Sequence, residues 1–373
     1  MSRSAIAILS TQNLLHNLAV VKATASHAKV IAMVKANAYG HGLRSVSSRL
    51  AAHVDILGVA SIDEALALRK AGVTVPILLI EGVFEASELQ VAATEGFQVV
   101  FHEKIQVDWL RHLTNPVPKL TAWLKVDTGM GRLGFSLSEA LHFYQQLFNS
   151  SQVDKPIRIL SHFACADMPA HDLNAEQMAR LKHFTQQLKG PKSPVSLCNS
   201  AGIFQFQDAH HDYVRPGIAL YGASPFANTT GQDAADLGLK PVMTLQTQII
   251  AIRRMAKGSP LGYGARYSCP EDMLVGVVAF GYGDGYPRTA RDGTPVLVNQ
   301  TQCALVGRVS MDMITVDLRP CPHAKIGDPV ILWGDGLPVE TVAKHTEQIS
   351  YDLLTGVQNR VKFHWTHYVP KSL

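Results

Sequence analysis

KVIAMVK, at residues 29–35, is the first of eight short apolar segments that alternate with helix-like segments as far as about residue 222. Amphipathic stretches such as SIDEALALRKAG (61–72) lie between them, with Ser61 as a candidate helix N-cap and Gly72 as a helix stop. Strands alternating with helices form βαβ units and a parallel sheet. Eight strands predict a closed (β/α)8 barrel of the TIM type, with a doubly wound open sheet as the competing architecture. The other seven segments are DILGVA (55–60), PILLIEG (76–82), FQVVFH (97–102), TAWLKVD (121–127), IRILSHF (157–163), VSLCNS (195–200) and YVRPGIAL (213–220).

The pattern changes beyond about residue 223. Residues 223–241 are rich in small and turn-forming residues, which is typical of a linker. After them come short β-like runs joined by close turns, such as MLVGVVAFGYGDGYP and DPVILWG. We therefore predict two domains, the barrel over residues 1–230 and a mostly antiparallel β domain over residues 231–373.

Composition and charge argue against several kinds of partner. The formal net charge is only +4 and the basic residues form no long run, so we expect no nucleic-acid binding. The first residues lack the continuous apolar core of a signal peptide, and no window holds the roughly 18 apolar residues of a membrane span. Five cysteines without a CxxC pair favour reduced thiols, with neither disulfides nor a zinc site. We expect a cytoplasmic protein that does not bind membranes.

Polar side chains occur where the predicted strands end, which is where barrel enzymes carry their active groups. Lys35 ends the first segment, and Gly40 and Gly42 allow the chain to turn beyond it. A single polar residue at such a position is ordinarily structural, but several of them on one barrel indicate a site. The other candidates are Tyr39, Lys125, Asp127, Arg132, His162, Asn199, Ser200 and Arg215.

Two motifs invite other interpretations. GMGRLG (129–134) matches the dinucleotide pattern G-x-G-x-x-G, but it lies mid-chain and no acidic residue ends the next strand, so we do not predict a nicotinamide or flavin site. His210 and His211 stand beside Asp208 and Asp212, which could suggest a metal. No third ligand with suitable spacing is evident, so we expect a solvated loop and no metal.

The type of residue at position 35 suggests a chemistry. Desolvation favours the neutral amine of a lysine, and a neutral amine can form a Schiff base with a carbonyl. If that carbonyl belongs to pyridoxal 5'-phosphate, Arg215 is the candidate for the ring nitrogen. An always-cationic arginine would leave that nitrogen unprotonated, which favours removing and returning one proton over transamination. Candidates for the phosphate, through hydroxyl or backbone N–H groups, are Tyr39, Ser200, Gly217 and Ile218.

Nine segments, in order and at matching spacings, resemble those of alanine racemases. The resemblance runs from about residue 29 to residue 352. It implies a pyridoxal-phosphate enzyme, built from a barrel plus a β domain, that interconverts L-alanine and D-alanine by two-base proton transfer. It also implies a homodimer with shared active sites, supplying D-alanine for peptidoglycan or serving alanine catabolism. The segments are AMVKANAYGHG (32–42), LKVDTGMGRLGF (124–135), SHFACAD (161–167), NSAG (199–202), VRPGIALYG (214–222), LGYGARY (261–267), GYGDGYPR (281–288), VGRVSMD (306–312) and ISYD (349–352).

The resemblance assigns roles to the matching positions. Lys35 resembles the Schiff-base lysine and one of the two bases, and Tyr263 resembles the second base, which reaches the site from the partner subunit. Arg132 resembles the arginine beside the cofactor's phenolic oxygen and the substrate carboxylate. His162 resembles the residue that links Arg215 to the protein and orients Tyr263. Lys125 resembles a lysine that is often carbamylated, although an ion pair with Asp127 is the ordinary expectation for such a residue.

The remaining matches concern binding and access. Met311 and Asp312 resemble partner-subunit residues near the substrate carboxylate, and Ser310 stands where the family often has Cys. The cofactor-binding set comprises Lys35, Tyr39, His162, Asn199, Ser200, Arg215, Gly217, Ile218 and Tyr351. The set at the entrance comprises Asp167, Tyr282, Arg288, Arg308 and Ile349.

Three alternatives remain at this stage. A barrel-type amino-acid decarboxylase would carry a glycine-rich phosphate segment and a Cys motif in the β domain, where this chain has SAG, VRPG and no such motif. A non-catalytic pyridoxal-phosphate carrier would not need Tyr263. A broad-specificity racemase is typically exported, whereas Tyr263, Tyr282 and Tyr351 indicate a small pocket suited to alanine.

Overall fold

The computed structural model describes residues 4–113 and 118–366. Within these ranges the chain divides into two compact units. The first comprises Leu18–Leu220, and the second comprises the residues up to Asn17 together with those from Tyr221 onward. Among the described residues, no helix is both long and apolar enough to cross a membrane.

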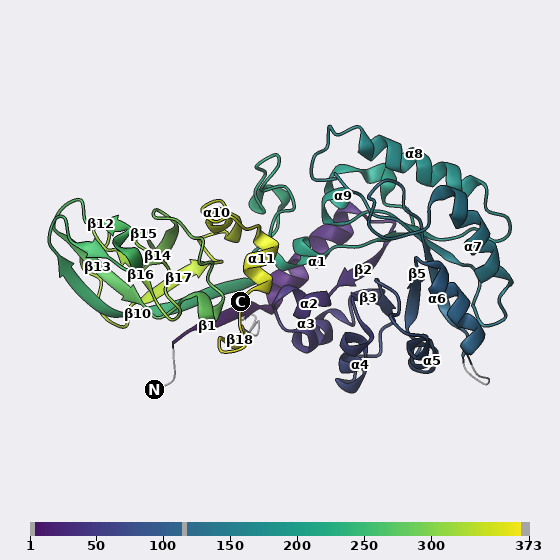
Figure 1. The fold of residues 1–373 in the computed structure, drawn as a ribbon, viewed down its shortest axis with the longest axis horizontal. Coiled ribbons are helices and arrows are strands. Elements are labelled where there is room, and N and C mark those ends of the chain that lie inside the picture. Colours follow the sequence, from purple (N-terminus) through teal and green to yellow (C-terminus); the bar gives the residue numbers. More distant parts are fainter. Residues whose placement is uncertain (1–3, 114–117, 367–373) are drawn as a thin grey trace, which may run out of the picture. The chain divides into compact units, whose positions relative to one another are not determined.

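Eight parallel strands form a closed barrel in the first unit (Figure 1). They are β2 (Lys29–Met33), β3 (Ile56–Val59), β4 (Ile77–Leu79), β5 (Gln98–Phe101), β6 (Thr121–Lys125), β7 (Arg158–Leu160), β8 (Val195–Ser196) and β9 (Tyr213–Val214). Each strand pairs with the next along the chain, and β9 returns to β2 with Lys29 opposite Tyr213 and Val30 opposite Val214. The predicted barrel is confirmed, and the open sheet is wrong.

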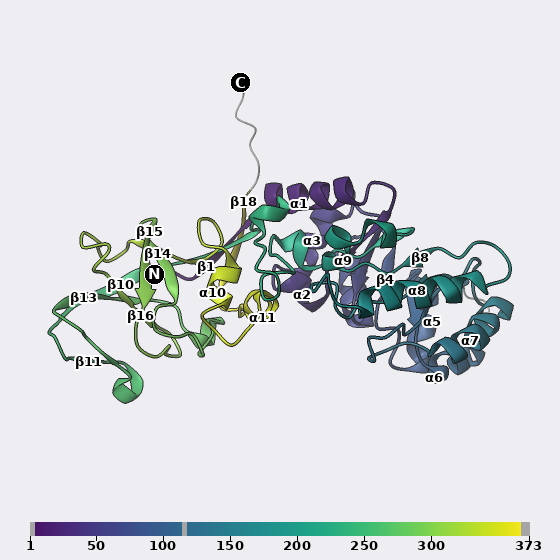
Figure 2. The ribbon, with the colours of Figure 1, turned by 90° about the horizontal axis from the view of Figure 1, so that it is seen from above.

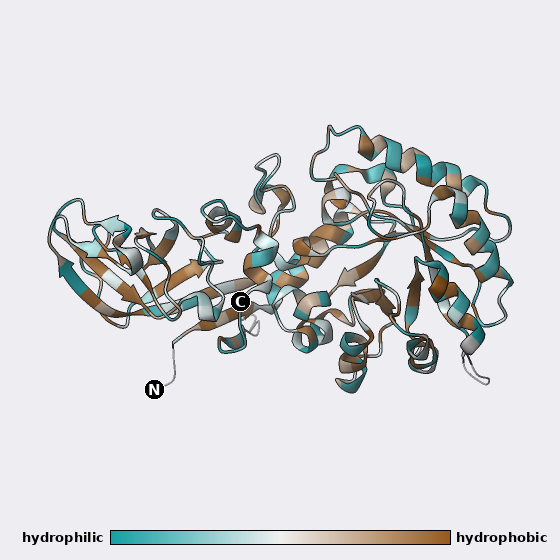
Figure 3. Cartoon of the chain, in the orientation of Figure 1, coloured by the Kyte–Doolittle hydropathy of each residue, from teal (hydrophilic) through white to brown (hydrophobic). Residues whose placement is uncertain are grey.

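Helices follow most of the strands, as the alternating pattern predicted. Ser61 caps α4 by accepting the N–H of Glu64 at 3.4 Å, and Gly72 has a φ of 81° just beyond the helix. In Figure 3 the helices around the barrel carry both hydrophobic and hydrophilic residues, as expected of helices with one buried side. They are α2 (Lys35–Tyr39), α3 (Leu43–Leu50), α4 (Ile62–Lys70), α5 (Ala86–Glu95), α6 (Lys104–Asp108), α7 (Leu137–Asn149), α8 (Leu173–Gln186) and α9 (Ser200–Gln205), while α1 (Thr11–Thr24) spans the boundary between the units.

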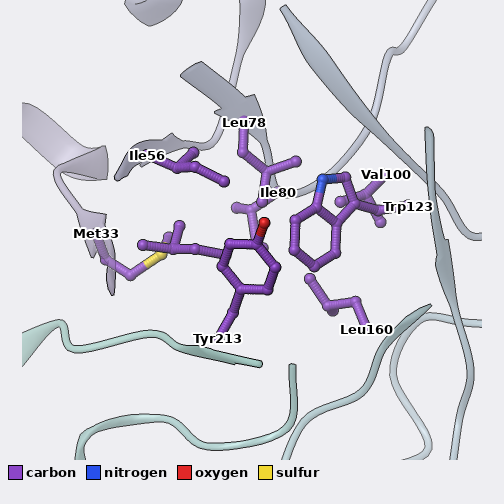
Figure 4. Packing of buried hydrophobic residues seen from close by; sticks show 9 residues of the cluster. Met33, Ile56, Leu78, Ile80, Val100, Trp123, Leu160 and Tyr213 are labelled. Carbon is purple, nitrogen blue, oxygen red and sulfur yellow. The ribbon is translucent and has the colours of Figure 1, made fainter. Parts of the chain in front are cut away.

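Side chains fill the inside of the barrel, so it is a packed core rather than a pore. Figure 4 shows Trp123 and Tyr213 among the aliphatic side chains of this packed core. Their rings meet edge to face with centroids 5.1 Å apart, and the indole N–H of Trp123 donates to Gln98 Oε1 at 2.7 Å. Gly58 leaves room for Met33, because a Cβ there would lie 2.6 Å from the Met33 sulfur. This core gives the loops at the carboxyl ends of the strands a rigid base.

An eight-stranded sheet organises the second unit, in the order β13-β16-β15-β14-β17-β10-β1-β18. Every pairing between neighbours in this order is antiparallel except that of β1 with β18. A small hairpin of β11 and β12 lies at the end of a long arm of this unit (Figure 2). The mostly antiparallel β domain is therefore confirmed. Its elements are β1 (Ile6–Ser10), β10 (Met243–Met255), β11 (Pro260–Leu261), β12 (Tyr267–Ser268), β13 (Met273–Val278), β14 (Pro295–Val298), β15 (Thr301–Leu305), β16 (Ile314–Asp317), β17 (Pro329–Trp333), α10 (Val339–Ala343), α11 (Ser350–Thr355) and β18 (Lys362–Thr366).

The division between the units differs from the boundary that we placed at residues 230 and 231. The strand β1 pairs with β10 and β18, so it belongs to the sheet of the second unit although it precedes the barrel in the sequence. The change of unit after the barrel falls at Leu220 and Tyr221. The 1–230 and 231–373 ranges rest on composition, which contains no information about such a long-range pairing.

Candidate active site

Lys35 lies two residues beyond the carboxyl end of β2, and the backbone after it is in the left-handed region. Residues 36–39, none of them glycine, have φ values of 53°, 54°, 54° and 51°. This region costs L-residues about 1–2 kcal/mol each. Such strain persists only where the surroundings impose it, and it clusters at functional sites. The element α2 is therefore a strained left-handed turn that fixes the backbone beside Lys35.

Glu64, on α4, holds this turn in place. Its Oε1 accepts the N–H of Ala36 at 2.8 Å, and its Oε2 accepts the N–H of Ala60 at 2.8 Å. The side-chain oxygen of Asn37 accepts the N–H of Leu43 at 2.8 Å, which ties the turn to α3. One carboxylate thus links the ends of two neighbouring barrel strands.

Arg215, after β9, is buried and is hydrogen-bonded to residues at the carboxyl ends of β7 and β8. Its guanidinium donates to Ser196 Oγ at 2.6 Å and to the carbonyl oxygens of Ser161 and Leu197 at 2.6 and 3.1 Å. It also donates to His162 Nδ1 at 3.1 Å. Burial lowers the pKa of Arg215 to about 10, so the group stays cationic at neutral pH.

His162, after β7, accepts this hydrogen bond as a neutral imidazole. Burial, and then the cationic Arg215, Lys125, Arg132 and Lys35, hold its pKa well below the ordinary value. The side-chain nitrogen of Asn199 lies 3.4 Å from the other ring nitrogen. The structure thus brings His162, Asn199 and Arg215 together at the barrel rim.

Three loops meet near Gly217. The hydroxyl of Ser200 accepts the N–H of Gly217 at 2.9 Å and that of Ala219 at 3.4 Å. A Cβ added at Gly217 would lie 2.3 Å from the hydroxyl oxygen of Tyr39, so only glycine permits this close approach. Burial raises the pKa of Tyr39 to about 12, so its hydroxyl keeps its proton. Hydroxyls and backbone N–H groups converge here, and Ile218 is buried beside them.

Lys125, at the end of β6, is buried in a strongly cationic environment. Its pKa falls to about 8, first because of burial and then because of Arg215 and Arg132, with a smaller contribution from Lys35. Glu81 acts in the opposite direction. Arg132 itself is exposed. At a pH near 8 a substantial share of Lys125 is therefore a neutral amine.

Among the described residues, Asp127 forms no ion pair with Lys125, although such a pair was the ordinary expectation. Its carboxylate accepts the backbone N–H groups of Gly129, Met130 and Gly131 at 2.8–3.2 Å. The glycine-rich GMGRLG segment therefore wraps around a carboxylate of its own chain.

Tyr263 belongs to the second unit, between β11 and β12. Its side chain is 71% exposed. Gly262 and Gly264, on either side, have φ values of 69° and 71°. A Cβ at Gly262 would lie 3.5 Å from the backbone nitrogen of Arg308, which places the hairpin against this predicted entrance residue.

Asp312 is held by a network within the second unit. Its Oδ1 accepts from Arg360 at 2.7 Å, and Arg360 also pairs with the buried Asp284 at 2.7 Å. The backbone of Tyr282 donates to Ser310 at 3.0 Å. The structure thus gathers Tyr282, Met311 and Asp312 in one place.

The other predicted residues lie at separate points. Asp167 is half-buried in the loop after β7, Arg288 is exposed, Ile349 is 43% exposed immediately before α11, and Tyr351 is half-buried on α11.

Sequence reasoning missed two residues of this region, Glu64 and Glu81. Glu81 Oε1 lies 3.1 Å from Lys35 Nζ. It sat inside the quoted PILLIEG segment, but a carboxylate just beyond a strand is common and gave no signal by itself. Glu64 lies in the SIDEALALRKAG segment, where an acidic residue in the first turn of a helix is ordinary. Of the two histidines for which we predicted a solvated loop, His210 is buried and donates to the carbonyl of Ile203 at 2.8 Å.

Comparisons with known proteins match both units. A family model described as alanine racemase, N-terminal domain, matches residues 9–225, and one described as alanine racemase, C-terminal domain, matches residues 242–365. The chain belongs to the alanine racemase family. An alanine racemase from Aeromonas hydrophila is 48% identical over 96% of this chain and 98% of its own length. One from Coxiella burnetii is 45% identical over 96% of this chain and 98% of its own.

Solved structures agree with the sequence relatives. The biosynthetic alanine racemase from Pseudomonas aeruginosa superposes with a TM-score of 0.93 at 40% identity, covering 98% of this chain and all of that one. The alanine racemase from Bartonella henselae, solved with covalently bound pyridoxal phosphate, superposes at 0.85 with 30% identity, covering 97% and 99%. As a member of the family, the chain is a pyridoxal-phosphate-dependent enzyme that interconverts L-alanine and D-alanine. The predictions of family, fold, activity and cofactor are confirmed.

The residues of the barrel rim fit this cofactor. The close approach at Gly217, where a Cβ would meet the Tyr39 hydroxyl, leaves backbone N–H groups and the hydroxyls of Tyr39 and Ser200 near one point. Such groups suit a phosphate. The buried guanidinium of Arg215 and the amine of Lys35 supply the two remaining kinds of group that the cofactor needs, a hydrogen-bond donor and a nucleophile.

Proposed function

We propose that Lys35 and Tyr263 are the two bases of the racemisation. A proton must leave Cα of alanine on one face and return on the other, which requires two groups on opposite sides. Bound pyridoxal phosphate supplies an electron-withdrawing ring that stabilises the negative charge left at Cα. Lys35 carries an amine at the barrel rim, and Tyr263 carries a phenol on an exposed hairpin. The family match over both units, together with these two side chains at the matching positions, carries the proposal.

Arg215 sets the character of the reaction. Its guanidinium has only N–H donors, so a ring nitrogen held against it would accept a hydrogen bond and remain unprotonated. Such a ring would draw less charge away from Cα, which would favour return of the proton to Cα. The four hydrogen bonds that hold Arg215 keep its side chain in a single orientation.

The other roles follow from chemistry and position. Arg132, Met311 and Asp312 bind near the substrate carboxylate. Lys125, as a neutral amine, adds carbon dioxide to give a carbamate and one released proton, which replaces a cation by an anion beside Arg132. The phosphate set is Tyr39, Ser200, Gly217, Ile218 and Tyr351, with His162 and Asn199 supporting Arg215. The entrance set is Asp167, Tyr282, Arg288, Arg308 and Ile349.

A homodimer with shared sites is part of this proposal. Tyr263 and Met311 are 71% and 54% exposed, which is unusual for large side chains that must act in a site protected from water. A second copy of the chain would cover them, and a two-fold dimer would complete two sites at once. We also propose a cytoplasmic enzyme, which serves D-alanine supply for peptidoglycan or alanine catabolism.

Exchange of the α-hydrogen for solvent deuterium tests the two bases. A panel of amino acids, scored for racemisation and for exchange, should show both reactions with either enantiomer of alanine. Tyr263→Phe removes only the hydroxyl, and we expect proton removal from one enantiomer to slow by about 10²–10⁴-fold. Tyr267→Phe, on the same hairpin, is the matched control. Equal and slight losses for both enantiomers would refute the role of Tyr263, and decarboxylation without exchange would refute the racemase.

Mixing two inactive variants tests the shared site. Lys35→Ala and Tyr263→Phe chains, unfolded together and refolded, should regain roughly a quarter of the wild-type activity, because half of the dimers are mixed and each has one intact site. If each site were built from one chain, the mixture would stay inactive.

A further inference from the structure

We propose that Arg360 is a positioning residue for the substrate: it ties the segment of Met311 and Asp312 to the turn at Tyr282 and offsets the charge of Asp312, so that this segment can lie close to a carboxylate. The inference rests on the proposed role of Met311 and Asp312. Neither the sequence motifs nor the family resemblance gave Arg360 any role.

One guanidinium joins three groups from two loops of the second unit. Arg360 Nη2 lies 2.7 Å from Asp312 Oδ1 and donates to the carbonyl oxygen of Met311 at 3.3 Å. Arg360 Nε lies 2.7 Å from Asp284 Oδ1, at the end of the turn that Tyr282 begins. Because the guanidinium is planar and rigid, bonds from two of its nitrogens fix Asp312 relative to Asp284 more closely than one flexible contact could.

Asp284 anchors this arrangement. Its side chain is fully buried, and its Oδ2 accepts the N–H of Gly281 at 2.8 Å. Its backbone carbonyl accepts the N–H of Gln358, two residues before Arg360, at 3.0 Å. A buried carboxylate is costly unless it is paired, so Asp284 holds the guanidinium firmly. The other end of the guanidinium is then fixed in place for Asp312, whose side chain is 44% exposed.

The two loops approach each other too closely for side chains between them. A Cβ at Gly283 would lie 2.8 Å from Arg360 Nη2 and 3.0 Å from the carbonyl oxygen of Met311. A Cβ at Gly281 would lie 2.3 Å from the carbonyl oxygen of Ser310. The N–H of Gly283 donates to the Met311 carbonyl at 2.8 Å, so this oxygen accepts from both the turn and the guanidinium. The place of Arg360 is therefore built into both loops.

The charges explain why a cation is needed here. Both enantiomers of alanine carry a carboxylate, and a second carboxylate close to it repels it. Asp312 brings such a charge to the place where the proposed function puts the substrate carboxylate. Arg360 supplies a positive charge against Asp284 and Asp312, and its removal would leave the segment more negative. The effect falls on binding of the carboxylate rather than on proton transfer at Cα, so KM should rise while kcat changes little.

Kinetics of Arg360→Met, with alanine as the substrate in both directions, test this inference. Methionine is similar in length but has neither the charge nor the donors. We expect KM to rise about 5- to 30-fold, between the effects of an exposed and a buried charge pair, and kcat to change less than about threefold. The inhibition constant of propionate, which is alanine without its amine, should rise by a similar factor.

Arg319→Met is the matched control, because Arg319 also pairs with two carboxylates of the second unit, Asp317 and Glu271. It has no place in the proposed site. We expect it to leave KM and the inhibition constant within about twofold of the wild type.

Two further variants separate charge from structure. Arg360→Met combined with Asp312→Asn removes the carboxylate that Arg360 offsets, so KM should return at least partway to the wild-type value, which a merely weakened fold would not do. A KM no lower than that of Arg360→Met would refute the charge balance. Arg360→Lys keeps the charge but lacks the planar fork, so its KM should lie between those of the wild type and Arg360→Met.

The outcomes separate the two proposals. If Arg360→Met had the KM of Arg319→Met, or if only kcat fell, Arg360 would not position this segment. If Asp312→Asn also left the inhibition constant of propionate unchanged, the segment would not lie near the substrate carboxylate, and that part of the proposed function would fail. A change with Asp312→Asn but none with Arg360→Met overturns only the inference. Should Arg360→Met fail to fold, Arg360→Lys is compared with Arg319→Lys in the same assays, and equal values would refute the role.

Discussion

Replacing Arg215 with lysine is expected to destabilise the cofactor-free enzyme by about 2–4 kcal/mol. The arginine donates to four acceptors, Ser196 Oγ, His162 Nδ1 and two backbone carbonyls, and it is buried. A lysine ammonium has only three donors and lacks the planar fork, so at least one acceptor loses its partner. A buried polar group left unpaired costs about 1–3 kcal/mol, and a second, poorly aligned bond accounts for the rest of the estimate.

Urea unfolding followed by circular dichroism measures this loss. Arg158→Lys is the matched control, because Arg158 stands on β7 of the same barrel and its buried Nε has no hydrogen-bond partner among the described residues. We expect this control to change the unfolding free energy by less than about 1 kcal/mol. If Arg215→Lys were no less stable than Arg158→Lys, the hydrogen bonds of Arg215 would not be what fixes the barrel rim.

Three further changes test other parts of the site. Burial lowers the pKa of Lys125 from 10.5 to about 8, so between these pH values the unfolded chain binds more protons than the folded chain. The free energy of unfolding should therefore rise with pH over this range, by up to about 3 kcal/mol from this group. The difference in urea midpoint between the wild type and Lys125→Met should show the rise, and a difference that does not change with pH would contradict it. Glu64→Gln offers one oxygen where two N–H groups are accepted, so we expect about 1–3 kcal/mol of destabilisation and faster amide exchange at Ala36 or Ala60; unchanged exchange at both would argue against its holding the turn. Gly217→Ala places a methyl 2.3 Å from the Tyr39 hydroxyl, at an overpacking cost of about 1–3 kcal/mol. We expect roughly ten- to hundredfold weaker cofactor binding in a titration of cofactor-free enzyme. Wild-type affinity would show that the close approach of Tyr39 to Gly217 is not needed for binding.

The barrel could be predicted because its signals are local. Each strand is a short apolar segment with a helix pattern after it, and polar residues at strand ends follow directly from that assignment. The antiparallel character of the second unit was equally visible in its closely spaced turns. The groups at the rim, including Lys35, His162 and Arg215, could be found before the structure because parallel strands present their carboxyl ends at one edge.

Other features could not be predicted because they depend on distant partners or oppose intrinsic preference. Ala36 and Tyr39 favour right-handed backbone, so nothing local predicts a left-handed turn that Glu64 holds from another helix. The pairing of Glu81 with Lys35 requires the curvature of the barrel to bring β2 and β4 together. The apolar run of β1 is visible in the sequence, but its neighbours in the sheet lie beyond the whole barrel.

The place of β1 has a consequence for the order in which the protein forms during synthesis. This strand leaves the ribosome before any barrel residue, yet it pairs with β10 and β18, which are made after the barrel is complete. At about 5–20 residues per second, on the order of tens of seconds separate β1 from its last partner. The barrel can close in that interval, because Leu18–Leu220 contains all eight of its strands. Until β10 has been made, β1 is an unpaired apolar strand, which is the kind of segment that exposes a nascent chain to aggregation.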